Sequence, residues 1–425
     1  MSTKIETPSS TGEAAGQSLQ SNRDFLNLWI AESISQVGSQ VSIVALPLLA
    51  ILTLEASPAQ MGYLTAAGTA PFLLIGLFVG VWVDRVRRRP LMVAADLVRG
   101  LLLLSIPILW WIGALRIEML YVVALLTGAL TVVFDVAWLT YLPSVVRRSQ
   151  LVEANSKLHV SASVAQVTGP GAGGALVGAV GAPLAVLLDA LSFFASAVFV
   201  RRVSPVETLS KSLAGARNVR GAIIEGLVFV YRDEVLRALV YAKIVVTFSA
   251  GIFFAVYVLF MADNLGLGAA LIGVVLATGG VGSLLGAAVT GRFSRRFGPG
   301  RTVVAGQFCF GVFGLAMPLA VFFPPIALVM VVLSEFAQWM AHIISQVNEL
   351  AIRQASVPDH YLGRVNSVFQ FFGRGMTPMG ALSGGLLGEL VGVPLTLVIA
   401  SGGFFLAFVF VLASPVRSFA QILDG

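Results

Sequence analysis

Gly-Val-Trp-Val-Asp-Arg-Val-Arg-Arg-Arg-Pro, residues 80–90, separates two long apolar runs with one acid and four arginines. An arginine at the centre of a bilayer costs roughly 2.5–3.5 kcal/mol, so a cluster this dense stays out of the hydrocarbon. Basic loops are also retained on the cytoplasmic side of membranes. The stretch therefore indicates a cytoplasmic loop between two membrane spans.

The composition agrees with a membrane protein. Hydrophobic residues make up 57% of the 425 residues, charged residues 11%, and the mean hydropathy is +0.91. A net charge of +6 would suggest nucleic acid in a soluble protein, but the position of the basic residues explains it here, and nucleic acid is not an expected partner. The single cysteine, Cys309, allows neither a disulfide framework nor a metal cluster. We expect no metal and no cofactor, with a proton gradient as the energy source.

Twelve windows of about 20 apolar residues are long enough to cross a bilayer core of roughly 30 Å as helices. They cover residues 25–53, 60–83, 91–113, 119–142, 158–180, 183–200, 239–262, 269–291, 302–323, 325–350, 366–390 and 393–413. The connections after the even-numbered spans carry the basic residues, whereas Arg116 stands alone on the other side. This bias predicts an all-α, multi-pass protein of the cytoplasmic membrane with both termini inside the cell.

The polar segment 201–237 divides the spans into two groups of six. Its composition predicts a cytoplasmic linker that ends in an amphipathic surface helix over Gly221–Arg232. The expected organisation is a disordered tail (1–24), a six-helix bundle (25–200), the linker, a second bundle (238–414) and a short tail (415–425). We expect the chain to act as a monomer in the lipid bilayer.

The two groups are copies of one another. A fixed shift of 211 residues aligns Gly62 with Gly273, Gly80 with Gly291, Asn155 with Asn366, Gly174 with Gly385, Gly181 with Gly392, and Pro183 with Pro394. Parallel repeats of this kind are typical of transporters whose halves rock around a substrate site near the middle of the membrane. The repeat favours transport by alternating access over a channel or an enzyme.

Three motifs resemble the major facilitator superfamily. Gly80-x-x-x-Asp84-Arg85-x-x-Arg88-Arg89 looks like that superfamily's loop between the second and third spans, and a degenerate copy begins at Gly291. Residues 169–174, Gly-Pro-Gly-Ala-Gly-Gly, resemble the antiporter motif of its drug exporters. The local sequence of residues 36–38 and 95–99 most resembles the branch of macrolide and enterobactin exporters.

The resemblance implies a proton-driven exporter with twelve helices in two pseudo-symmetric halves, whose first, fourth, seventh and tenth spans line a central cavity. The chain departs from the pattern twice. Arg87 stands where the loop usually has glycine, and residues 119–128 lack the arginine that many drug-proton antiporters carry near the start of the fourth span. Proton coupling through that arginine is not expected.

The arginine-rich loop has two possible roles. Asp84 would suit the positively polarised start of the eleventh helix, and Arg85, Arg88 and Arg89 could pair acids or carbonyls when the cavity is closed to the cytoplasm. With Gly80, these residues would form a gate. The alternative is that the arginines only anchor the span.

The fifth span also has two interpretations. Gly169, Gly173 and Gly174 remove side chains and Pro170 removes a backbone donor, which permits a close helix contact and a bend. The segment could take part in the conformational change of exchange, or it could serve packing alone.

The strongest candidate site residues are ionisable groups inside the spans, where a charge is costly enough to suggest a function. They are Glu32, Asp135, Lys243, Glu335, His342 and Arg374. The shift of 211 places Glu32 and Lys243 at equivalent positions with opposite charge, and Glu32, Gln36 and Gln40 form one polar stripe. We hypothesise that Glu32 is a proton or cation site balanced by Lys243, and that Asp135 and Glu335 share the substrate and proton work.

Structural roles are the alternatives. Glu32 with Lys243, and Glu335 with Arg374, could form salt bridges that close the cavity, and His342 could be a packed histidine instead of a proton relay. Asp96 and Arg99 are three residues apart, which predicts a local ion pair. Asp189 is expected to be structural.

The expected cavity wall is apolar and aromatic, which suits an amphipathic organic molecule better than a sugar or a phosphate ester. The candidate aromatic residues are Phe25, Trp29, Phe72, Phe134, Trp138, Phe248, Phe253, Phe254, Tyr257, Phe336 and Trp339. We expect export of a drug-, macrolide- or siderophore-like compound by proton antiport. A proton-independent facilitator or importer is the alternative, and a non-transporting sensor has no sequence support. The sequence has no nucleotide-binding loop and no catalytic constellation, so an enzyme is not expected.

Overall fold

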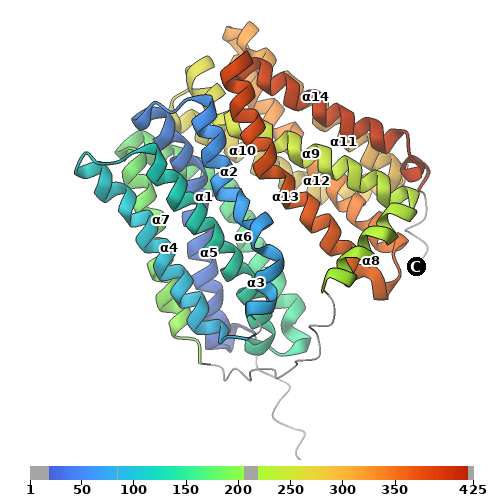
Figure 1. Ribbon diagram of the computed structural model, residues 1–425, viewed down its shortest axis with the longest axis horizontal. Helices are drawn as coiled ribbons and strands as arrows, with labels where there is room; N and C mark the ends of the chain where they lie inside the picture. The colour runs from blue at the N-terminus through green and yellow to red at the C-terminus, as the bar shows by residue number, and fades with distance from the viewer. Residues whose placement is uncertain (1–18, 84, 205–218, 420–425) are drawn as a thin grey trace, which may run out of the picture.

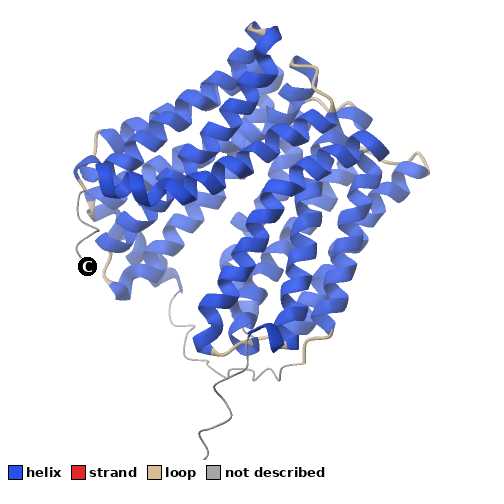
Figure 2. Cartoon of the chain, turned by 180° about the vertical axis from the view of Figure 1, so that it is seen from behind, coloured by secondary structure: helices blue, strands red, loops and turns tan. Residues whose placement is uncertain are grey.

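The computed structural model describes residues 19–83, 85–204 and 219–419, and its regular elements there are all helices (Figure 1, Figure 2). The first half contains α1 (Arg23–Leu54), α2 (Pro58–Leu74), α3 (Gly76–Val83), α4 (Arg88–Trp111), α5 (Ile117–Val145), α6 (Leu151–Val180) and α7 (Ala182–Arg201). The second contains α9 (Glu234–Leu259), α10 (Ala269–Phe297), α11 (Pro299–Leu319), α12 (Ala327–Ser356), α13 (Asp359–Val391) and α14 (Val393–Leu412). Between them in sequence lies α8 (Val219–Arg232). Short helical turns cover Leu19–Ser21, Arg148–Gln150, Phe260–Asn264, Ala320–Phe322, Pro324–Ile326 and Pro415–Ser418.

Helix boundaries repeat between the halves because the same kinds of residue end them. Asn22 caps α1 by accepting hydrogen bonds from the backbone of Asp24 and Phe25, and Asp233, its counterpart at the shift of 211, caps α9 in the same way. Gly181 ends α6 at φ 85° and Gly392 ends α13 at φ 86°, a backbone conformation that glycine adopts without steric cost. Equivalent helices of the two halves therefore begin or end at positions that the shift of 211 relates.

Nine helices in the described part of the chain are long and apolar enough to cross a membrane. The other three expected spans are α6, α13 and the second span, which was predicted as one helix over 60–83 but breaks between α2 and α3. The break lies at Ile75, next to Gly76, which is a poor helix former. These three spans contain more small residues than the nine apolar helices, which suits close packing against neighbouring helices.

Each half packs its six spans in the same order. In the first half α1 contacts α6 and α7, α4 contacts α5 and α7, and α2 contacts α5. In the second half the equivalent helices make the equivalent contacts, with α9 against α13 and α14, α11 against α12 and α14, and α10 against α12. Two further pairs join the halves, α2 with α13 and α6 with α10. The sequence repeat is thus also a repeat of packing.

Four glycines allow close backbone contacts between the halves. A Cβ atom on Gly62 would lie 2.7 Å from the Gly385 Cα, and a Cβ on Gly174 would lie 2.6 Å from the Gly273 Cα. The shift of 211 converts one pair into the other. Any side chain would push the helices apart, so glycine is required for this approach.

Both glycine pairs lie at the same end of the molecule. Gly62 is near the start of α2 and Gly174 near the end of α6, whereas α1 begins, α7 ends and α8 lies at the opposite end, called here the linker face. At the glycine end the Glu389 carboxylate also accepts a 3.3 Å hydrogen bond from the Ala59 backbone. The halves are therefore closed together at the end opposite the linker face (Figure 1).

Replacing Gly62 or Gly174 by valine is expected to open that closed end. Overpacking typically costs about 1–3 kcal/mol, so the opening equilibrium should shift roughly 5- to 150-fold. The measurement is the rate at which a thiol reagent, applied from the closed end, labels Thr65→Cys in a Cys309→Ser background, because Thr65 faces the space between the halves. Gly402→Val is the control, since a Cβ there meets nothing within 4 Å. Equal labelling in all three variants would contradict the role of the glycine pairs.

Candidate functional site

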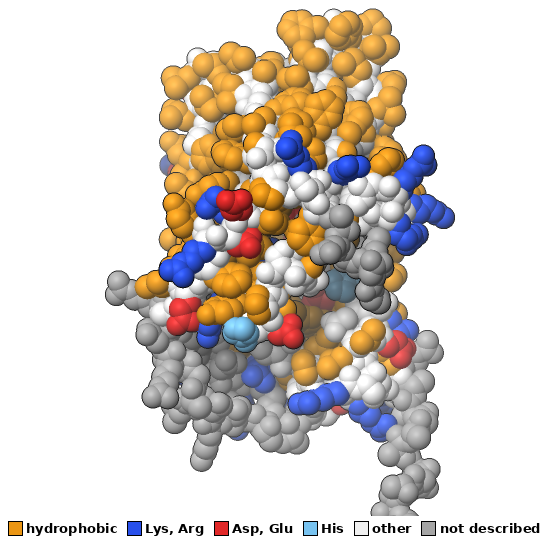
Figure 3. All heavy atoms as spheres, turned by 90° about the vertical axis from the view of Figure 1, so that its right-hand side faces the viewer, with side chains coloured by type: hydrophobic (Ala, Val, Ile, Leu, Met, Phe, Trp, Pro, Cys, Tyr) orange, Lys and Arg blue, Asp and Glu red, His pale blue; other side chains and the backbone are white. Residues whose placement is uncertain are grey.

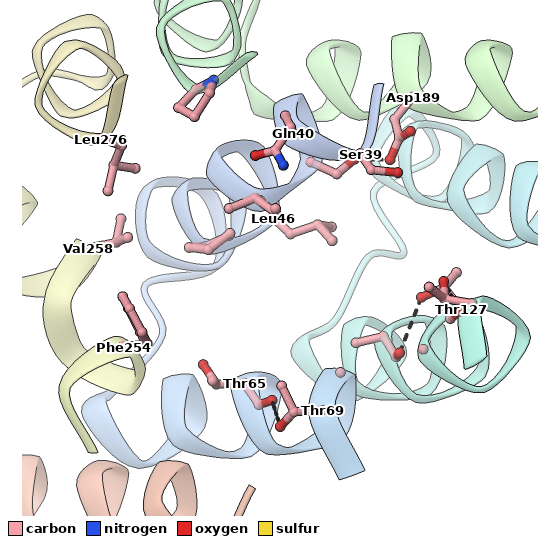
Figure 4. Close-up of a pocket in the computed structure, with 18 of the residues that line it drawn as sticks. Ser39, Gln40, Leu46, Thr65, Thr69, Thr127, Asp189, Phe254, Val258 and Leu276 are labelled. Carbon is pink, nitrogen blue, oxygen red and sulfur yellow. Dashed lines mark hydrogen bonds between the residues drawn. The ribbon is translucent and has the colours of Figure 1, made fainter. Parts of the chain in front are cut away.

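A cavity of about 740 Å³ lies between the two halves and is walled by helices from both (Figure 4). Ser39, Gln40, Leu46, Thr65 and Thr69 face it from the first half. Phe254, Val258 and Leu276 face it from the second half. The volume is that of a site for a small organic molecule.

The polar groups of the wall are largely occupied by the protein itself. The Thr69 hydroxyl donates to the Thr65 carbonyl at 2.8 Å, Thr127 to Val123 at 2.6 Å, and Thr131 to Thr127 at 2.8 Å. These three hydroxyls satisfy themselves on their own helices, whereas the side chains of Gln40 and Gln166 also line the wall. The remaining wall is mainly aliphatic and aromatic, so the cavity favours apolar contact over a fixed hydrogen-bond pattern.

Glu335 on α12 is the buried acid of the second half, and it lines the cavity. Its side chain is 2% exposed and accepts hydrogen bonds of 2.8 Å from the Tyr257 hydroxyl and the Trp339 indole. Within the described ranges, no lysine, arginine or histidine forms an ion pair with it. The carboxyl group is therefore positioned by neutral donors and carries no fixed counter-charge.

Asp189 on α7 faces the cavity from the first half (Figure 4). The sequence had predicted a structural role for this residue, away from the cavity. Its carboxylate accepts hydrogen bonds from the hydroxyls of Ser42 and Ser192, the latter at 3.2 Å. A Cβ on Gly38 would lie 2.6 Å from the carboxylate, so glycine makes room for it. Asp189 was identifiable from sequence only as one more charge within a span.

Arg99 and Asp96 form the predicted ion pair inside the first half. Ser196 donates to the same carboxyl group at 2.7 Å, and the guanidinium of Arg99 lies 4.5 Å from the ring centre of Phe134 and 4.3 Å from that of Phe193. Arg99 is 4% exposed yet also lines the cavity. The sequence predicted the ion pair but did not predict that Arg99 lines the cavity.

Glu32 and Lys243 do not pair in this conformation. Glu32 accepts a 2.7 Å hydrogen bond from Gln36. It lies eight residues before Gln40, about 12 Å closer to the linker face at 1.5 Å per residue. Lys243 borders a separate small pocket with His342 and Glu349. Of the polar stripe, only Gln40 reaches the main cavity.

Asp135 and Arg374 also lie outside the main cavity wall. The positive charges of Arg99 and Arg374 both act on Asp135, and the guanidinium of Arg374 lies 4.6 Å from the ring centre of Phe72 in the other half. Arg374 therefore does not neutralise Glu335. Its contacts link the second half to Asp135 and Phe72 of the first.

The small pocket reveals a second feature of the repeat. Its wall includes Lys243, Gln307, His342 and Gln346. At the shift of 211, these four residues correspond to Glu32, Asp96, Thr131 and Asp135 of the first half. Both halves thus keep a polar cluster at the same place, which holds Glu32 and Asp135 in the first half and Lys243 beside Glu349 in the second. His342 packs against Phe310 and Trp339, with ring centres 5.1 and 5.6 Å away.

The glycine motif of α6 packs that helix between its two neighbours. A Cβ on Gly169 would lie 2.3 Å from the Gln40 Cβ, one on Gly173 would lie 3.1 Å from the Val41 Cα, and Gly174 meets α10. Pro170 lines the cavity. The motif therefore joins the cavity wall to the contact between the halves.

The arginine-rich loop contacts its own half where it is described. Arg89 donates a hydrogen bond to the Arg201 carbonyl at the end of α7, where a cation is favourable. Arg85 is exposed, Arg88 begins α4, and a Cβ on Gly80 would meet nothing within 4 Å. Asp84 lies outside the described residues.

The aromatic wall was predicted in part. Phe72, Phe254, Tyr257 and Trp339 line the cavity, as Phe193 also does. In contrast, Phe25, Phe134, Trp138 and Phe253 are buried inside the bundles, with exposed fractions of 1–8%. Residue type indicates burial in both cases, and only the rotation of each helix decides which side chain reaches the cavity.

Comparison with known proteins agrees with this architecture. The family described as transmembrane secretion effector matches residues 17–423. The multidrug efflux pump Tap of Mycolicibacterium fortuitum is 28% identical over 389 residues, which cover 89% of this chain and 92% of that pump.

A solved structure also shares the fold. An inward-facing bacterial homologue of the iron transporter ferroportin superposes with a TM-score of 0.74 at 18% identity, covering 93% of this chain and 99% of that one. An outward-facing structure of a bacterial ferroportin homologue superposes with a TM-score of 0.58 at 19% identity, covering 92% of this chain and 98% of that one. Together with the repeat and the cavity between the halves, these matches show that the chain is a multi-pass membrane transporter of the major facilitator superfamily, in its transmembrane secretion effector family.

Proposed function

We propose that the protein exports amphipathic small organic molecules from the cell in exchange for protons, by alternating access. The observation that supports this most directly is the cavity between the halves. Its wall is mainly apolar, it holds the buried and ion-unpaired acid Glu335, and glycine pairs close one end. An apolar site with a titratable group is suited to exchanging a hydrophobic molecule for a proton.

The direction follows from the basic residues. The linker face carries the arginine-rich loops, so it lies on the cytoplasmic side by the positive-inside rule. The conformation described here, closed at the opposite end, would then load its cargo from the cytoplasm or the inner leaflet. The name of the related multidrug efflux pump supports the same direction.

The wall chemistry favours a broad range of cargo. Because Thr69, Thr127 and Thr131 use their hydroxyls on their own helices, a ligand is held mainly by contact with aliphatic and aromatic side chains. Such contact tolerates changes in shape better than a buried hydrogen-bond pattern, which rejects any ligand that leaves a polar group unpaired. Drug-like amphipathic compounds fit this wall better than sugars.

The polar clusters of the two halves provide a means of closing the cytoplasmic side. Glu32, Asp96 and Asp135 give the first cluster excess negative charge over Arg99, and Lys243 places a positive charge in the second, beside Glu349. When the halves rotate to close the linker face, the two clusters would approach one another. Protonation of the acidic cluster would weaken that attraction, which couples proton binding to the conformational change.

Efflux from inverted membrane vesicles is the experiment that tests the proposed function. Cargo uptake into the vesicles should require an inward-acidic proton gradient and collapse with a protonophore, and macrolides, tetracyclines, lipophilic dyes and catechol siderophores form the panel. Uptake that is equal with and without the gradient would favour a facilitator. Binding without any gradient-dependent movement would reject antiport.

Glu335→Gln should uncouple transport from the gradient, because glutamine keeps the shape and the contacts to Tyr257 and Trp339 but cannot exchange a proton. Coupling between two sites is typically worth about 1–3 kcal/mol, so gradient-driven accumulation should fall roughly 5- to 150-fold while cargo binding persists. Uptake and binding are measured in the same vesicles. Glu118→Gln, at an exposed acid, is the matched control. Full gradient-driven accumulation in Glu335→Gln would exclude this residue as the proton site.

Glu32→Gln and Lys243→Met should each reduce gradient-driven efflux, because each removes one member of the opposed polar clusters. If the two residues pair when the cytoplasmic side closes, the double variant should be less impaired than the sum of the single effects. Glu153→Gln and Lys157→Met, which separate a pair 3.9 Å apart outside the cavity wall, are the controls. Wild-type efflux in either single variant would remove that residue from the mechanism.

A further inference from the structure

Asp189 is a buried acid of the cavity wall that the proposed exchange at Glu335 does not use. The residue is 2% exposed and faces the cavity from the first half. On the face of the molecule shown in Figure 3, a broad hydrophobic band lies above the charged side chains, as contact with lipid requires. An ionisable group inside the spans is costly, which suggests a function for Asp189 as it does for Glu335.

The charged groups around Asp189 are engaged elsewhere or lie far from it. Within the described ranges, no lysine, arginine or histidine forms an ion pair with Asp189. Of the helices packed against α7, α4 presents Arg99, whose charge acts on Asp189 but whose guanidinium donates to Asp96. The nearest charged residue of α1 is Glu32, ten residues before Ser42 and about 15 Å closer to the linker face at 1.5 Å per residue. The charged residues of α6 all lie near its linker-face end.

The hydroxyl partners of Asp189 can satisfy its carboxyl group in both protonation states. Ser42 donates to one carboxylate oxygen, and Ser192 donates to the other at 3.2 Å and to the Asp189 carbonyl at 2.8 Å. A hydroxyl is both a donor and an acceptor. When the carboxyl group takes up a proton, Ser42 can accept its O–H and donate to the carbonyl of the preceding turn, while Ser192 keeps its bond to the Asp189 carbonyl. Neither state leaves a buried donor unpaired, which suits a reversible proton site.

Glu335 has the same kind of surroundings in the second half. The Tyr257 hydroxyl donates to one of its oxygens and the Trp339 indole to the other, both at 2.8 Å. Each acid thus combines one reversible hydroxyl with a second donor on the other oxygen. The shift of 211 does not relate Asp189 to Glu335, so the two acids are not copies of one another. The cavity receives one carboxyl group of this kind from each half.

We propose that Asp189 is a second proton-binding residue of the cavity and that each transport cycle exchanges two protons for one cargo molecule. The inference rests on the proposed proton antiport and extends it from Glu335 to Asp189. When the cavity is open to the outside, each carboxylate takes up one proton, and the new O–H donates to the reversible hydroxyl. When the cavity is open to the cytoplasm, both O–H bonds break and the protons leave as cargo enters. The two carboxylates then regain their hydroxyl donors.

Infrared difference spectroscopy tests, without any cargo, whether Asp189 binds a proton. The full-length protein in nanodiscs is compared between acidic and alkaline buffer, because a carboxylate that gains a proton gains a C=O stretching band. We expect Asp189→Asn to lose one band and Glu335→Gln to lose another, whereas Glu153→Gln, at an acid outside the cavity wall, loses neither. A wild-type spectrum in Asp189→Asn overturns the proposal, because Asp189 would then keep one protonation state.

A second pair of variants keeps both acids and changes only their hydroxyl partners. Ser42→Ala removes the acceptor for the carboxyl proton of Asp189, so the Asp189 band should move to higher frequency while the Glu335 band stays in place. Tyr257→Phe is the matched variant and should move the Glu335 band alone. The pair also decides the question if Asp189→Asn does not fold. Bands that Ser42→Ala leaves unmoved contradict the proposal.

Steady-state accumulation in the inverted vesicles counts the protons. The probe is ethidium, whose charge does not change with pH, and the membrane potential is clamped at zero with valinomycin and potassium. Each exchanged proton then contributes a factor of about ten per pH unit, so the wild-type protein should reach about 100-fold accumulation and Asp189→Asn about tenfold. A residue that only holds cargo or structure would change the rate of accumulation and not this ratio.

The same measurement separates the second proton from the antiport itself. Accumulation of about tenfold per pH unit in both proteins overturns the role of Asp189 and leaves exchange at Glu335 intact. Accumulation that is equal with and without the gradient rejects proton antiport, and the infrared bands then decide by themselves whether Asp189 binds a proton.

Discussion

The structure depends on a close backbone contact between its two halves. Gly62 with Gly385, and Gly273 with Gly174, let α2 approach α13 and α6 approach α10 without side chains between them. Such contacts gain dispersion energy over a small area and leave no interlocked side chains to separate. An interface of this kind can hold one end closed and still open. The cavity exists because the halves diverge from this contact.

The charges within the spans are arranged asymmetrically on a symmetric scaffold. The repeat preserves the position of a polar cluster in each half but changes its charges, with Glu32 and Asp135 in one and Lys243 and Glu349 in the other. Identical halves would have repelled one another at this point. In the main cavity the acids Asp189 and Glu335 are instead held by hydroxyl and indole donors, without a paired cation for Glu335 in the described residues. Charge is thus distributed differently near the linker face and in the cavity.

Sequence reasoning succeeded where the interaction is local and failed where it depends on how helices rotate and meet. Asp96 and Arg99 pair because three residues place them on one helical face. Glu32 and Lys243 were expected to face one another, yet they lie in opposite halves that are apart on this side, so no local pattern could decide whether they touch. Asp189 on α7 and Arg99 on α4 line the cavity, which follows from how these helices pack. In the same way, the sequence did not predict that Phe134 and Trp138 are buried inside the bundle and do not line the cavity.

The sequence alone determined the membrane class, the approximate spans, the division at 201–237 and the repeat, because hydrophobicity, charge bias and helix-ending residues act locally. The family followed from short motifs and was shown by comparison over nearly the whole chain. Only the tertiary structure decided which end is closed and which acids line the cavity. Those properties depend on the relative rotation of packed helices and on the conformation adopted by two halves, and one sequence encodes more than one such arrangement.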